Sequence, residues 1–185
     1  MSAMRNPRSR LGALMVGLAA AACLFGVVGV VYGPIMDELF VAVRGMGAYL
    51  NGNRIRVSSV RHLKASLLST GFPYDITTNP DNNIDHFVDF LYEAQAVRRD
   101  GSAALNLSYV ACGRFDGFWE ISLNPWDLAA GALIVEEAGG SLSSISGGRF
   151  NIYGGGVIAS NGLIQEAMTE VIGRDLPSGP NEKMP

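Results

Sequence analysis

The sequence predicts an α/β fold built in layers, because segments with strand character alternate with segments of helical periodicity along the chain. The clearest strand signal is the β-branched run from Val27 to Val31, and the clearest helix signal is the segment 124–140. Hydrophobic residues make up 48% of the 185 residues and charged residues 17%, against roughly a quarter charged in ordinary globular domains. We therefore expect an ordered chain with a substantial core.

The first half predicts strands. The run from Val27 stops at the turn signal Gly33-Pro34. Residues 37–45 and 47–58 then read as a strand pair, with Asn51-Gly52 as the hairpin signal between them. Residues 66–71 predict a further short strand, which the loop 72–82 follows.

The segment 84–94 predicts an amphipathic helix. Its apolar residues recur at helical spacing, so we expect one face to be buried. That face comprises Ile84, Phe87, Val88 and Leu91.

The second half alternates strands and helices. Asn124 predicts a helix N-cap, Pro125 suits the first helical position, and Asp127 stands where a capping-box acid would. This helix is apolar almost all round, so we expect it between layers. The other expected elements are strands at 97–101, 114–122 and 154–161 and helices at 102–113 and 163–173.

The amino terminus has a different character. Three arginines precede an uncharged run from Leu11 to Met36, which is typical of a signal peptide or a membrane anchor. The alternative is that the end of the run forms a buried strand. We expect an apolar leader at 1–25, a domain at 26–173 and a disordered tail at 174–185, and we favour an accidental leader on a cytoplasmic protein over a working anchor.

Composition also excludes some partners. The formal net charge is −3, and no dense run of Lys and Arg occurs, so the sequence predicts no nucleic-acid surface. Cys23 and Cys112 stand far apart without metal-type spacing. We interpret them as reduced thiols in the cytosol.

Three short segments place polar groups beside helix starts or strand ends. Residues 98–103 pass from strand to helix through a glycine, and free N–H groups at a helix start favour an anion such as phosphate; a solvated turn is the alternative. Glu120 ends an aromatic strand, where it either accepts sugar hydroxyls or is an ordinary edge acid. Asp127 either binds a hard cation such as Mg²⁺ or caps its helix.

Read together, these segments resemble a known family. The stretch 98–140, RRDGSAALNLSYVACGRFDGFWEISLNPWDLAAGALIVEEAGG, closely resembles the second signature region of the inositol monophosphatase family. The stretch 29–52 resembles the strand and hairpin that precede that region. The resemblance covers roughly 26–172, and its WD-x-A-A-G-x-x-I-V-x-E-A-G-G run is specific.

The resemblance implies a fold and a function. The fold is the carboxyl-terminal part of a layered αβαβα sandwich of the inositol monophosphatase and sugar phosphatase type. The function is Mg²⁺-dependent hydrolysis of a phosphate monoester, an inositol monophosphate above all, by metal-activated water. Family members are commonly dimers and generally cytosolic, so the resemblance also implies a homodimer in the cytoplasm.

The resemblance also implies roles for individual residues. Asp127 matches the aspartate that binds a catalytic magnesium and touches the substrate. Glu120 matches the acid that hydrogen-bonds ring hydroxyls. The substrate-binding set is Arg98, Gly101, Ser102, Ala103, Glu120 and Asp127.

One departure limits these implications. The family's acidic GE-type motif and D-P-[LI]-D-G-[ST] motif, which supply most metal ligands, do not occur in this sequence. One aspartate cannot hold several Mg²⁺ ions, because each needs several oxygen ligands. We therefore expect the chain alone to be weakly active or inactive, and the alternative function is a non-catalytic or membrane-anchored binding protein of this family.

Overall fold

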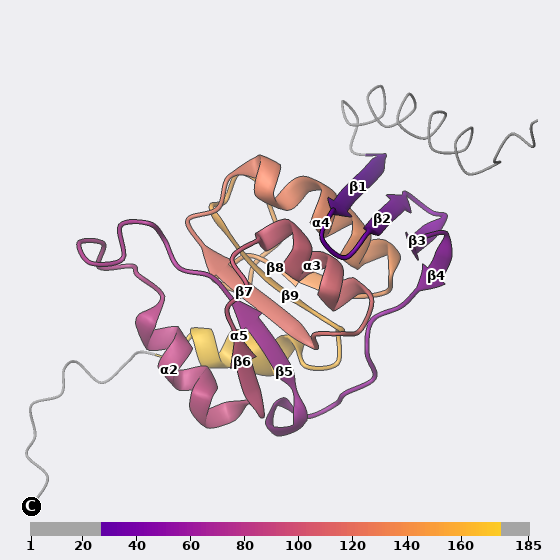
Figure 1. Ribbon diagram of the computed structural model, residues 1–185. Coiled ribbons are helices and arrows are strands. Elements are labelled where there is room, and N and C mark those ends of the chain that lie inside the picture. The colour runs from indigo at the N-terminus through magenta and orange to yellow at the C-terminus, as the bar shows by residue number, and fades with distance from the viewer. Residues whose placement is uncertain (1–26, 175–185) are drawn as a thin grey trace, which may run out of the picture.

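The computed structural model describes residues 27–174, which form four layers (Figure 1). An antiparallel sheet comes first, helices α3 and α4 lie beneath it, a mixed sheet follows, and helices α2 and α5 cover that sheet's far face. The predicted layered α/β fold is confirmed. The predicted leader (1–25) and all but the first residue of the predicted tail lie outside the described residues.

The first sheet is a meander of four strands. Its strands run in sequence order: β1 (Val28–Gly33), β2 (Glu38–Val43), β3 (Gly47–Leu50) and β4 (Asn53–Ile55). The predicted strand pair therefore needs a correction, since Asn51 and Gly52 join β3 to β4 within the second predicted strand. Both have positive φ, 49° and 81°, and this conformation ends a strand and starts a hairpin.

The second sheet has the strand order β6-β5-β7-β9-β8. Its central strand β7 (Gly117–Ile121) lies parallel to β5 (Leu67–Thr70), which lies parallel to β6 (Ala96–Arg98). Strands β9 (Gly156–Ser160) and β8 (Ser141–Ser143) complete the sheet in antiparallel pairs. The short β8 has no counterpart among the predicted strands.

Helices α3 (Ala103–Ala111) and α4 (Pro125–Glu137) fill the space between the sheets. Every residue of α4 from Gly131 to Val135 is buried, as its all-round apolar sequence predicts. The larger core cluster forms here, with Phe40 from the first sheet and Phe118 from the second. Helix α4 starts at the predicted cap Asn124 with Pro125 in its first turn.

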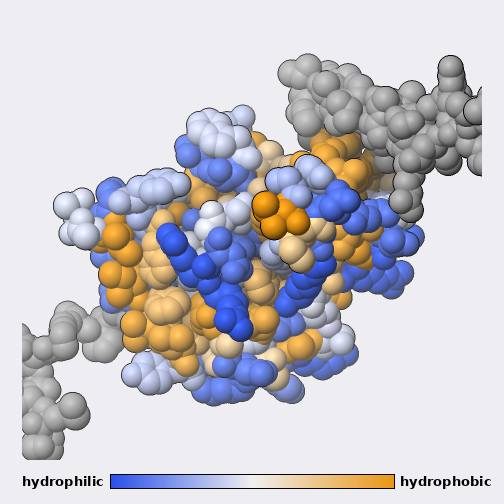
Figure 2. Space-filling model, in the orientation of Figure 1, coloured by the Kyte–Doolittle hydropathy of each residue, from blue (hydrophilic) through white to orange (hydrophobic). Residues whose placement is uncertain are grey.

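Helices α2 (Ile84–Glu93) and α5 (Gln165–Ile172) pack on the other face of the second sheet. The predicted buried face of α2 is wrong at three of its four positions, since only Phe87 of that set packs against the core. Phe90 is fully buried against Trp119, with ring centroids 4.1 Å apart, whereas Ile84, Val88 and Leu91 are 43%, 41% and 53% exposed. The aromatic contact sets the rotation of the helix, and Figure 2 shows the apolar surface that remains over α2.

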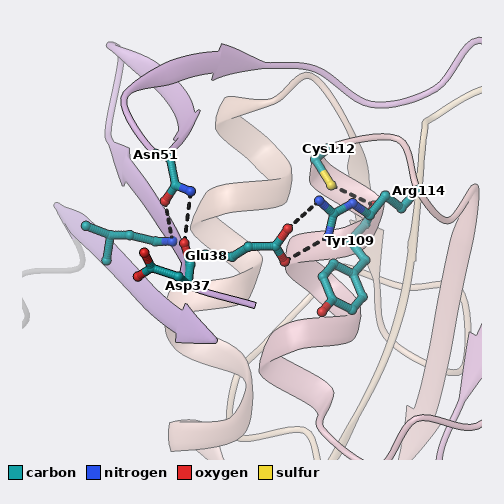
Figure 3. A network of polar contacts seen from close by, with 7 residues as sticks. Asp37, Glu38, Asn51, Tyr109, Cys112 and Arg114 are labelled. Carbon is teal, nitrogen blue, oxygen red and sulfur yellow. Dashed lines mark hydrogen bonds and ion pairs between the residues drawn. The ribbon is translucent and has the colours of Figure 1, made fainter. Parts of the chain in front are cut away.

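An ion pair ties the first sheet to the turn after α3 (Figure 3). The Arg114 guanidinium donates two hydrogen bonds to the buried Glu38 carboxylate, one of them 2.8 Å long, and lies over the Tyr109 ring. This pairing holds the pKa of Glu38 below its ordinary value. In the same view, the Asn51 side chain bonds the Leu39 N–H and the Asp37 carbonyl, which fixes the end of the hairpin.

Between residues 27 and 174, none of the helices combines the length and the apolar character that crossing a bilayer requires.

Candidate functional site

The candidate site lies at the carboxyl edge of the second sheet. Parallel strands end at the same edge, so pairing of β5 with β6 and with β7 brings their carboxyl ends together. Arg98 is the last residue of β6, Glu120 is next to last in β7, and Asp127 stands in the first turn of the following helix. The sheet thus gathers the three predicted segments.

The predicted turn from strand to helix has the expected form. Gly101 has φ +85°, which an L side chain adopts with strain. Ser102 is the N-cap of α3, and its hydroxyl accepts a hydrogen bond from the Leu105 N–H at 3.4 Å. Ala103 begins the helix and packs against the core. This helix start presents backbone N–H groups beside the sheet edge, a geometry that favours an anion.

Glu120 lies against the end of the neighbouring strand. Its neighbour Trp119 packs on the α2 side of the sheet, so by strand alternation Glu120 faces α3 and α4. A Cβ at Gly71 would stand 2.2 Å from the Glu120 Oε1 atom. With glycine at this position the carboxyl group can lie against the end of β5, whereas a larger residue would displace it. A glycine closing the predicted strand 66–71 was the available sequence signal.

Electrostatics link Glu120 to both neighbouring segments. Burial and, to a smaller degree, the nearby Asp127 carboxylate raise the pKa of Glu120 to about 7, although the Arg99 guanidinium opposes both. Arg99, absent from the predicted set, is thus the cation that acts on this carboxyl group. Arg98 is exposed at the end of β6.

Asp127 is confirmed as a helix-capping acid. Its Oδ2 atom accepts a hydrogen bond from the Asn124 N–H at 3.0 Å. A carboxylate has about four acceptor positions, so this bond leaves capacity for another ligand. The structural role and a metal-binding role are compatible.

The carboxylates present suit part of a Mg²⁺ shell. Mg²⁺ in phosphate-handling sites is held by one or two carboxylates together with phosphate oxygens and water. The Asp127 carboxylate raises the pKa of Glu120, and a divalent ion bound nearby would offset this repulsion. Within residues 27–174, however, no three His, Cys, Asp or Glu side chains cluster as a metal site. These residues fit one side of a metal site.

A cavity of about 500 Å³ opens near the same edge, but it is a different site. Its walls include Asn83, His86, Ile121 and Gly155. None of the six predicted site residues lines it.

Comparisons with known proteins identify the family of this chain. The inositol monophosphatase family matches residues 11–178. The inositol-1-monophosphatase of Synechocystis sp. is 46% identical over 145 residues, which cover 78% of this chain and 50% of that protein. The Nus factor SuhB of Escherichia coli (strain K12) is 48% identical over 141 residues, 76% of this chain and 53% of that protein.

Solved structures with a similar fold are also inositol monophosphatases. The inositol monophosphatase from Anabaena (Nostoc) sp. superposes with a TM-score of 0.77 at 45% identity, covering 78% of this chain and 57% of that one. The Thermotoga maritima IMPase superposes with a TM-score of 0.71 at 40% identity, covering 79% of this chain and 55% of that one. The chain spans about half the length of the curated relatives it matches. With the family match extending over most of the chain, these findings show that the protein belongs to the inositol monophosphatase family.

Proposed function

We propose that this chain forms the substrate side of a Mg²⁺-dependent phosphatase site that acts on an inositol monophosphate. The observation that supports it is the convergence of the α3 start, Glu120 and Asp127 at one sheet edge. Family membership supplies the reaction class. When bound, Mg²⁺ would polarise the phosphate and activate a water molecule.

Each residue then has a role that its position supports. The N–H groups at the start of α3, with Gly101, Ser102 and Ala103, contact the ester and the inositol ring. Arg98 adds positive charge beside them. Asp127 provides an anionic oxygen to Mg²⁺ while keeping its helix-capping bond.

Glu120 recognises ring hydroxyls. With its pKa raised to about 7, the carboxyl group is a mixture of acid and carboxylate at neutral pH. A hydroxyl both donates and accepts hydrogen bonds, so Glu120 pairs with it in either state. A phosphate ester next to two carboxyl groups adds negative charge, which is the electrostatic reason for a divalent cation here.

A second candidate is inositol phosphate binding without turnover. It is favoured by the finding that residues 27–174 hold no cluster of three metal-ligating side chains. In both cases we propose a cytoplasmic protein that forms a homodimer, with membrane attachment as the alternative if the apolar leader is a true anchor.

Titration of the full chain with myo-inositol 1-phosphate and millimolar Mg²⁺, followed by NMR and by phosphate release, tests these proposals. We expect the amide signals of Ser102 and Glu120 to shift on binding, with hydrolysis little above background. Myo-inositol and inorganic phosphate, each alone, are the control ligands. Rapid turnover would contradict our account of the metal site, and unshifted signals at saturating ligand would contradict the substrate site itself.

A further inference from the structure

A buried asparagine, absent from the predicted site, joins the end of β5, which Gly71 follows, to β7, which carries Glu120. Asn83 is 4% exposed, and its amide group faces β5 and β7. Its Nδ2 atom donates to the Thr70 hydroxyl at 2.9 Å and to the Gly71 carbonyl at 2.7 Å. Its Oδ1 atom accepts the Trp119 indole N–H at 2.8 Å. Both ends of the amide are therefore satisfied by neighbouring strands.

Helix capping does not explain this asparagine. Asn83 occupies the N-cap position of α2, yet its side chain makes no capping bond. The Asn82 side chain accepts the Ile84 N–H at 3.0 Å instead. Asn83 also adopts the left-handed conformation, φ 70°, whereas an N-cap is typically extended. This strained conformation accompanies a side chain that bonds the sheet.

The bonded groups adjoin the candidate site from the opposite face of the sheet. The Glu120 carboxyl group lies where a side chain at Gly71 would stand. Trp119 directly precedes Glu120 in β7. The Thr70 hydroxyl donates to the Trp119 carbonyl at 2.7 Å, which closes the network. Thr70 and Trp119 are the last paired residues of β5 and β7. The side chains of Thr70 and Asn83 thus fix the register of the two strands at this end.

We propose that Asn83 is a positioning residue that holds the carboxyl ends of β5 and β7 together, so that Glu120 stays over Gly71. The role in substrate recognition rests on the proposed function of Glu120. Without the amide, the strand ends separate and the Glu120 carboxyl group loses its fixed place. Recognition of ring hydroxyls then weakens, while phosphate recognition at the start of α3 is preserved.

Two substitutions separate the bonds that Asn83 makes. Asn83→Gly suits the positive φ and deletes all three bonds. Asn83→Asp keeps an acceptor for Trp119 and replaces the donor to Gly71 with an oxygen. Asn82→Ala is the matched control, because it removes a capping bond of the same helix and leaves the network intact.

Indole exchange measured by NMR gives a readout that does not need a ligand. The chain has two tryptophans, and Trp126 is 77% exposed, so a slowly exchanging indole N–H belongs to Trp119. We expect this protection in wild type, Asn82→Ala and Asn83→Asp, and its loss in Asn83→Gly. The amide signals of Gly71 and Glu120 should move in both Asn83 variants and stay in place in the control.

Affinity gives the functional readout. The Kd for myo-inositol 1-phosphate should rise about tenfold in both Asn83 variants, as expected for one or two lost hydrogen bonds, with less than about a twofold change for inorganic phosphate. Unmoved Gly71 and Glu120 signals in both variants would overturn the positioning role. If wild type fails to bind the ester, the proposed function fails, and the same signals still decide whether Asn83 holds the strand ends. Should Asn83→Gly not fold, Asn83→Asp still tests the proposal through the Gly71 and Glu120 amide signals and through the Kd.

Discussion

At the scale of single residues, the fold brings the pKa of the Glu120 carboxyl group close to neutral pH. Burial and Asp127 raise its pKa from the ordinary 4.5 to about 7. Between pH 4.5 and about 7, Glu120 therefore keeps its proton in the folded chain, whereas it has already lost that proton in the unfolded chain. By linkage, this contribution to stability is fully present below about pH 4.5 and is lost as pH rises through about 7.

Glu120→Gln should remove this pH dependence. The free energy of unfolding of wild type should fall relative to the variant between pH 4.5 and 7, by on the order of 1–2 kcal/mol once partial exposure is allowed for. Urea unfolding at a series of pH values measures the difference. Glu136→Gln, at an exposed position of α4, is the control and should follow wild type. Parallel curves for wild type and Glu120→Gln would show that the fold does not perturb this carboxyl group.

Asp127→Asn separates the capping role from the metal role. An amide oxygen still accepts the Asn124 N–H, so the stability loss should stay within about 1 kcal/mol, the value of a charge at a helix start. Binding of Mg²⁺ or Mn²⁺ should be abolished, since the anionic oxygen is gone. Calorimetric titration is best done in a chain that also carries the missing family motifs from a relative, because one aspartate binds metal weakly. Equal metal affinity in both proteins would refute the ligand assignment.

Sequence reasoning found the parts of the site that have local signatures. Asp127 and Ser102 stand at helix starts, where capping chemistry is visible in the sequence. Gly71, Arg99 and Asn83 were missed because their roles depend on partners that are distant in the chain. Asn83 in particular looks like an ordinary N-cap, and its bonds to Gly71 and Trp119 exist only after the sheet has formed.

At the scale of elements, the contact between α3 and α4 sets the thickness of the central layer. Gly131 of α4 faces Leu107 of α3, and a Cβ added there would lie 2.7 Å from the Leu107 Cβ and 2.6 Å from its Cδ1. A Cβ cannot move away without its backbone. The small residue thus permits the close approach of two helices that carry the candidate site on their first turns.

Gly131→Ala should force these helices apart. Overpacking destabilises by about 1–3 kcal/mol and the better helix propensity of alanine stabilises by about 1 kcal/mol, so we expect a net loss of up to about 2 kcal/mol. Thermal and urea unfolding measure it. Gly148→Ala is the control, since its added Cβ meets no atom closer than 3.4 Å and its φ is not positive. A variant as stable as wild type would mean that the helices adjust without cost.

The elements also show where periodicity is a poor guide. Helical spacing alone gave α2 a buried face of Ile84, Phe87, Val88 and Leu91. Only Phe87 packs against the core, and the other three are substantially exposed. The deciding contact is between the rings of Phe90 and Trp119, which lie far apart in the sequence. By contrast, the sequence predicted the burial of α4 correctly, because this helix is apolar on every side and no single buried face had to be chosen.

At the scale of the whole molecule, the first sheet presents apolar residues on the face away from α4. Gly29 packs against Ala130 of α4, so the alternate residues Val30 and Tyr32 point outward. Cross-strand pairing places Leu39 beside Tyr32 and the buried Val41 beside Val30. Tyr32 is 53% and Leu39 37% exposed, and contiguous apolar surface of this kind promotes association.

We therefore expect the full chain to self-associate through this face. Leu39→Lys should shift the population toward monomer, because it places a charge in the centre of the contact. Sedimentation velocity over a range of concentrations measures the distribution. Tyr74→Lys, which changes a fully exposed aromatic residue in the loop before α2, should leave association unchanged. A concentration-independent monomer in wild type would refute the prediction.

The order of strands in the two sheets has a consequence for how the molecule acquires its structure. The meander β1–β4 pairs neighbours in the sequence, whereas the second sheet joins β5 to β7 across some fifty residues, as in the pairing of Leu68 with Gly117. Closing long loops costs chain entropy before distant contacts compensate for it. In refolding we thus expect the hairpins to form early and the edge that joins Gly71 to Glu120 to be completed last.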